Sequence, residues 1–92
     1  MLGSEDKVIK EKDFTYKGNP YIARLYSHEN KPMIYGEIVH KENDQRVHNM
    51  KGLAREFLKP YGIVVPTDAK TMVTHSAVAL LIQKLEETRN EK

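Results

Sequence analysis

The sequence contains no cysteine among its 92 residues. It therefore carries neither a disulfide framework nor a thiolate zinc site, which fits a cytoplasmic protein. No apolar run approaches the roughly 20 residues that a membrane-spanning helix needs, so we expect no membrane partner. The net charge is only +2, which is too small for a strong general attraction to polyanions.

The patterns that accompany catalysis are also missing. The glycines are isolated and form no phosphate-binding loop. No pair of carboxylates has a spacing that suggests acid–base work. His75 stands between two hydroxyl residues, but neighbours on a helix point about 100° apart and cannot relay a proton. We therefore predict that the protein is not an enzyme and needs no cofactor.

What is present describes one small globular domain. The hydrophobic fraction is 39% and the charged fraction is 30%, which is typical of a folded chain and not of a disordered one. We predict a disordered tail over residues 1–7, a single α+β domain over 8–88 and a frayed tail over 89–92.

Two turn signals divide residues 13–39 into three short runs. In the first signal, residues 17–20, glycine and asparagine tolerate positive φ and proline cannot donate to a ladder. A two-residue loop at 18–19 would place Asp13 opposite Arg24, an opposite-charge pair that supports a sheet.

The second turn signal is the polar stretch 27–32, which ends in proline. A four-residue loop over 28–31 would place Arg24 opposite Tyr35 on the next strand. Because side chains alternate along a strand, the two registers together sort the residues onto two faces.

One face of the predicted sheet is nearly all apolar and should meet the core. It holds Phe14, Tyr16, Tyr21, Ala23, Leu25, Ile34, Gly36 and Ile38. The other face is mixed and mildly acidic. It holds Glu11, Asp13, Thr15, Ile22, Arg24, Tyr26, Met33, Tyr35 and Glu37. Tyrosine, methionine and arginine are enriched at protein–protein contacts, whereas the carboxylates would repel a nucleic acid.

The polar stretch after Val39 has two interpretations. Asp44 caps a helix that begins at Gln45, because its carboxylate can accept the free amides of the first turn. Alternatively, this stretch is a hairpin tip, residues 46–49 form a fourth strand and Asn49 caps the helix. Helical spacing of the apolar residues supports a helix through Leu58 on either interpretation.

A β-branched segment, residues 63–65, indicates a short strand or an extended crossing between the helices. Thr67 or Asp68 then caps a final helix that runs toward Glu87 or Arg89. These patterns predict an α+β fold: a three-stranded antiparallel meander, with a fourth strand as the alternative, followed by two helices packed on one face.

The final helix is apolar on every side over residues 77–82, and such a helix must be enclosed. In so small a domain, we expect Val78 and Ile82 to remain uncovered. The hairpin interpretation would also set His40 opposite His48, where two imidazoles could hold zinc or nickel weakly. Ordinary surface histidines are the favoured interpretation, and we predict no metal site.

Two functions are consistent with these patterns. The first is a non-enzymatic module that binds another protein, or itself as a homodimer through the last helix. Its candidate contact residues are Ile22, Arg24, Tyr26, Met33, Tyr35, Val78 and Ile82. The alternative is a nucleic-acid-binding domain that uses a basic edge of the middle helix. Its candidates are Lys41, Arg46, Lys51, Arg55 and Lys59.

Overall fold

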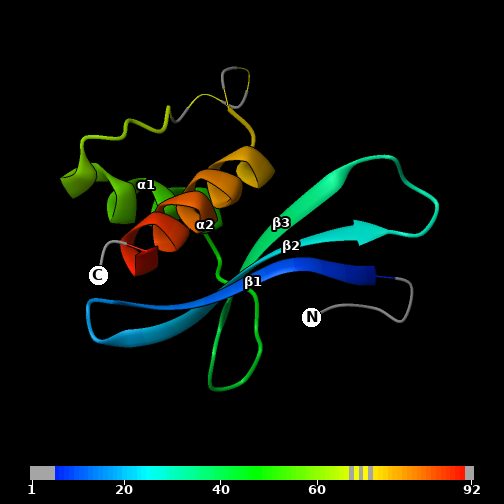
Figure 1. Ribbon diagram of the computed structural model, residues 1–92, viewed down its shortest axis with the longest axis horizontal. Helices are drawn as coiled ribbons and strands as arrows, with labels where there is room; N and C mark the ends of the chain where they lie inside the picture. Colours follow the sequence, from blue (N-terminus) through cyan, green and yellow to red (C-terminus); the bar gives the residue numbers. More distant parts are fainter. Residues whose placement is uncertain (1–5, 67, 69, 71, 91–92) are drawn as a thin grey trace.

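The chain folds as an antiparallel sheet followed by two helices, as the sequence predicts. The computed structural model describes residues 6–66, 68, 70 and 72–90. Its elements are β1 (Asp6–Tyr16), β2 (Asn19–His28), β3 (Ile34–His40), α1 (Met50–Leu58), the 3-10 helix η1 (Lys59–Tyr61) and α2 (Thr74–Asn90). The strands lie in the order β1-β2-β3 (Figure 1).

Regular secondary structure reaches beyond the predicted bounds of the domain, 8 and 88, at both ends. Asp6 and Lys7 belong to β1 although a tail was predicted over residues 1–7. The backbone of α2 continues to Asn90, within the tail predicted over 89–92. Residues 1–5 and 91–92 lie outside the described residues.

The first hairpin turns one residue earlier than predicted, which changes its register by two. Its loop is Lys17-Gly18, with φ of 53° and 80°, and positive φ at both central residues is what a type I′ hairpin turn requires. The predicted pairing of Asp13 with Arg24 is therefore wrong. Arg24 lies opposite Glu11 instead.

The second hairpin is also displaced by two residues. Arg24 lies opposite Glu37, and Tyr26 lies opposite Tyr35, so the predicted pairing of Arg24 with Tyr35 is wrong. Because the side-chain period of a strand is two, shifts of two leave every residue on its predicted face. The predicted assignment of residues to the two faces is therefore correct, although both predicted registers are wrong.

Both helices cover one face of the sheet (Figure 1). The sheet contributes Phe14, Tyr21, Ala23 and Ile38 to the core, and the helices contribute Ala54, Leu58, Ala77, Val78, Leu81, Ile82 and Leu85. Ile34 is the exception on this face, because it is 54% exposed.

Val78 and Ile82 are 0% and 1% exposed, so the expectation that they would remain uncovered is wrong. The reason is how closely α2 approaches the sheet at Gly36. A Cβ atom added to Gly36 would lie 2.8 Å from the Val78 Cβ atom. The Gly36 amide also donates to Nδ1 of His75 at 2.9 Å, which holds the first turn of α2 against β3.

Asn49 caps α1, because its Oδ1 accepts the Gly52 amide at 3.0 Å. Asp44 instead sits in the preceding loop with a φ of 58°, so the prediction that it caps a helix is wrong. This loop returns alongside β3 but makes only one ladder bridge, between Val39 and Arg46. Residues 46–49 therefore do not form a fourth strand.

The loop register also separates the two histidines that the hairpin interpretation paired. The His40 amide donates to the Gln45 carbonyl at 2.8 Å, and the Val47 amide donates to the Ile38 carbonyl at 2.9 Å. His40 therefore lies beside Gln45 and not opposite His48.

The two helices are joined by η1 and a segment whose described residues, 62–66, 68, 70, 72 and 73, form no helix or strand. Within this segment Val65 is buried in the core. The last helix begins at Thr74, so Asp68 does not cap it. The Asp68 carboxylate accepts the Lys70 amide at 2.9 Å, and Thr67 lies outside the described residues. Over the described ranges, neither helix combines the length and the apolarity needed to cross a bilayer.

Candidate functional site on the outer face of the sheet

The outer face of the sheet is the face turned away from the helices. The register places its side chains in rows that cross all three strands. One row is charged and holds Glu11, Arg24 and Glu37. The next row is apolar and aromatic and holds Val8, Tyr26 and Tyr35. The outer face is therefore divided into a charged half and an aromatic half.

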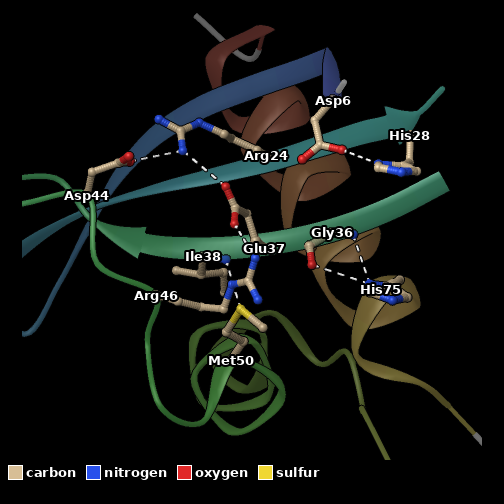
Figure 2. Close-up of polar contacts among 10 residues, drawn as sticks. All are labelled: Asp6, Arg24, His28, Gly36, Glu37, Ile38, Asp44, Arg46, Met50 and His75. Atoms are coloured by element: carbon tan, nitrogen blue, oxygen red, sulfur yellow. Dashed lines mark hydrogen bonds and ion pairs between the residues drawn. The ribbon is translucent and has the colours of Figure 1, made fainter. Parts of the chain in front are cut away.

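Glu37 is the centre of the charged row and is 0% exposed. Each of its carboxylate oxygens accepts a hydrogen bond from a different arginine. Nη1 of Arg24 donates to Oε2 at 3.1 Å, and Nη2 of Arg46 donates to Oε1 at 3.0 Å (Figure 2). A buried carboxylate is stable only when it is paired and hydrogen-bonded in this way.

Arg24 has two further carboxylate partners. Its Nε donates to Glu11 at 2.5 Å, and its Nη1 donates to Asp44 at 3.0 Å. Burial alone would lower the pKa of Arg24, but the hydrogen bonds to Glu11, Glu37 and Asp44 together raise the pKa above its ordinary value. Arg24 therefore stays charged, and its side chain is only 14% exposed.

The charged row fastens the loop after β3 to the sheet. Asp44 and Arg46 both belong to this loop, and both reach the row from the same side (Figure 2). Val39, which lies on the outer face and yet is fully buried, forms a ladder bridge with Arg46 of the same loop. The chemistry of the charged row is therefore structural, because its groups are directed at one another.

Among the described residues, no loop is held over the aromatic half by ion pairs of this kind. The rings of Tyr26 and Tyr35 stack with their centroids 5.7 Å apart, and His75 meets the Tyr35 ring edge-on at 5.0 Å. Partial burial raises the pKa of the Tyr26 phenol above its ordinary value. Val8, in the same row, is 44% exposed.

The edge of the aromatic half is polar. Nδ1 of His28 lies 2.7 Å from Oδ1 of Asp6 (Figure 2). These two residues, with Lys31 and the two tyrosines, line an open hollow of about 270 Å³. Its walls can hold an apolar side chain and give hydrogen bonds around it, and their described residues include no serine, threonine or cysteine.

The predicted protein-binding residues fall into three places. Tyr26 and Tyr35 stack together in the aromatic half, and Met33, in the loop before β3, is 54% exposed. Arg24 belongs to the charged row, and Ile22 lies half-buried one row further along β2. The remaining two, Val78 and Ile82, are buried on the opposite face.

Sequence reasoning missed three residues of the aromatic half: Asp6, Val8 and His28. A bulge in β1 between Val8 and Lys10 interrupts the alternation. Counting back from Phe14 with a period of two therefore gives the wrong face for the first residues of β1. The only sequence signal was the pair of β-branched residues at 8–9 inside a segment otherwise rich in lysine.

Most of the predicted nucleic-acid-binding residues already have partners within the chain. Lys41 donates to Asp13 at 2.9 Å, and Arg46 is bound to Glu37. Nζ of Lys51 donates to the carbonyl oxygen of Met72. The last two are Arg55, 3.5 Å from Glu56, and Lys59, which is exposed.

No group of three or more histidine, aspartate or glutamate side chains could hold a metal ion within the described part of the chain. Comparison with protein families, with curated proteins and with solved structures finds no match to this chain.

Proposed function

We propose that the protein is a non-enzymatic module that binds another protein through the aromatic half of its outer sheet face. The observation that carries this proposal is the row of Val8, Tyr26 and Tyr35, which crosses three strands on the face opposite the helices that the structure describes (Figure 1). Tyrosine offers a large apolar area and a polar tip, and both favour protein contacts.

The support beneath the rings also favours binding. Tyr35 is held between the Tyr26 ring and His75, and His75 is bonded to the backbone of Gly36. Rings that are already fixed lose little rotamer freedom when a partner docks on them, so more of the contact energy is available for affinity. Self-association through α2 is not part of the proposal, because Val78 and Ile82 are buried.

A capture experiment with the immobilised protein tests this proposal. Extract of the native host is treated with nuclease and passed over wild-type protein and over the variants Val8→Ser and Met33→Ser. Both side chains are exposed, so their truncation should leave the domain folded. We expect both variants to lose the captured protein.

Val73→Ser is the matched control, because Val73 is 48% exposed but lies just before α2, outside the aromatic half. It should retain the captured protein. Capture that nuclease abolishes, or that neither Val8→Ser nor Met33→Ser weakens, would refute the proposal.

A further inference from the structure

A second surface lies on the solvent side of α1. Arg55, Glu56 and Lys59 form one wall of a groove, and residues 62–65 form the other. This groove, named here the α1 groove, has a volume of about 490 Å³. A smaller hollow of about 190 Å³, lined by Asn49, Lys51, Gly52, Arg55 and Pro66, adjoins it at Arg55.

The apolar wall of the α1 groove is fixed in place. Gly62 has a φ of 78°, which turns the chain back along α1 (Figure 1). Val65 is then anchored in the core at 2% exposure, while its neighbour Val64 is 83% exposed. No other large apolar side chain in the described part of the chain is as exposed as Val64. An anchored segment thus holds an apolar side chain in solvent beside a helix.

The opposite wall is basic. Arg55 and Lys59 line the α1 groove, and Lys51, one turn before Arg55, lines the smaller hollow, so the three cations follow one side of α1 into the start of η1. Among the described residues that line the two hollows, Glu56 is the only acid. Its contact with Arg55 spans 3.5 Å between two side chains that are almost half exposed, and such surface pairs contribute little.

We infer that the α1 groove binds an acidic amphipathic helix of a partner protein. Apolar residues on one side of that helix would cover Val64 and Ile63. Carboxylates spaced one turn apart on its flank would match Arg55 and Lys59, because one turn separates these two residues as well. Complementary charges of this kind fix the register of a helix in a groove.

A protein helix fits this groove better than a nucleic acid does. Phosphates would be neutralised by the basic wall, but they would leave Val64 in water and would meet Glu56. The groove also presents no aromatic ring to a base in its lining. The inference concerns a different surface from the aromatic half and does not depend on it.

Fluorescence anisotropy tests the inference. The probe is a labelled synthetic helical peptide with leucines on one face and glutamates on the other. We expect Val64→Ser and Lys59→Gln each to weaken binding about 3–10-fold, the loss of roughly one apolar contact or one charge pair. Glu56→Gln should tighten binding, because it removes the one repulsive carboxylate.

The controls separate this surface from the aromatic half. Val8→Ser and Lys7→Gln change similar side chains on β1 and should leave peptide binding unchanged. A peptide of the same composition with leucine and glutamate intermixed should bind weakly or not at all.

Three results would overturn the inference. They are absence of peptide binding to the wild type, equal binding of the intermixed peptide, and binding that neither Val64→Ser nor Lys59→Gln affects. Displacement of the peptide by duplex DNA in wild type and Val64→Ser alike would assign the basic wall to nucleic acid instead. Because Val8→Ser reports on the aromatic half alone, failure of one proposal leaves the other standing.

Discussion

At the residue scale, the stability of the outer face depends on Glu37. Its carboxylate is fully buried and has lost its hydration, so the guanidinium groups of Arg24 and Arg46 must replace the water. Removing one of these partners leaves a buried negative charge that is only half compensated. The cost of that change is larger than the worth of the pair itself.

Arg24→Met should therefore lower the free energy of unfolding by about 3 kcal/mol, the lower end of the range for a broken buried pair, because Arg46 remains. Urea denaturation followed by circular dichroism measures this loss. The double variant Arg24→Met/Glu37→Met should recover much of it, because the buried charge is removed together with its partner.

Lys41→Met is the matched control for Arg24→Met. It breaks the pair between Lys41 and Asp13, whose side chains are 51% and 58% exposed, and should cost less than about 1 kcal/mol. Equal losses for Arg24→Met and Lys41→Met would contradict the structural role of the charged row.

The sequence predicts the face of Glu37 correctly but does not indicate that Glu37 is buried. Alternation along a strand depends only on the period of two, so it survives both register shifts. Burial depends on what lies above the strand, which is the loop carrying Asp44 and Arg46. No local pattern in residues 41–47 indicates that this loop folds back over the sheet.

At the element scale, the register of the first hairpin follows from the side-chain pairs across the strands and not from the turn that residues 18–19 favour. Glycine and asparagine favour a loop at 18–19, but the observed loop gives Lys17 a positive φ. In the observed register, the rings of Phe14 and Tyr21 stack at 5.4 Å, and Arg24 lies between two glutamates. Several pairs across the sheet outweigh the cost of roughly 1–2 kcal/mol for one residue in the left-handed region.

The burial of Val78 and Ile82 could not be predicted from the sequence for a related reason. A helix that packs on a sheet contacts it along one side, which leaves part of its circumference uncovered. Gly36 lets α2 come closer at one point, and Val65, which follows η1, joins the same core. The sequence shows an isolated glycine in a strand, but it does not show which helix residue lies over it.

Gly36→Ala should separate α2 from β3 and lower the free energy of unfolding by about 1–3 kcal/mol, as overpacking does. The added Cβ atom would meet Val78 at 2.8 Å and the His75 carbonyl oxygen at 3.3 Å. Thermal or urea denaturation measures the loss.

Val78→Gly tests whether Val78 is the obstacle to Gly36→Ala, because the atom at 2.8 Å is the Val78 Cβ atom, which an alanine would keep. Alone, it should destabilise by leaving a cavity. Combined with Gly36→Ala, it should cost clearly less than the sum of the two single changes, because the new methyl group occupies the space that is vacated. Strict additivity would show that the close approach at Gly36 does not limit the packing of α2.

At the scale of the whole molecule, the net charge is only +2. In addition, most of the predicted nucleic-acid-binding residues already contact a partner within the chain. Of the five predicted nucleic-acid-binding residues, Lys41, Arg46 and Arg55 contact carboxylates, and Lys51 donates to a carbonyl group. A phosphate would have to compete with these contacts. Lys59 is exposed and pairs with no carboxylate among the residues that the structure describes, so the basic edge is smaller than the sequence suggests.

We therefore expect binding to generic duplex DNA to be weak and detectable only at low salt. Each neutralised phosphate contributes about −0.9 to the slope of log K against log salt, so one or two available cations predict a slope of about −1 to −2. A salt titration followed by anisotropy of labelled DNA measures the slope. Lys59→Gln should bring the slope about one unit closer to zero, whereas Val64→Ser should not change it. A slope steeper than about −4 would mean that the internal ion pairs open to admit phosphates, and nucleic-acid binding would then rank above protein binding.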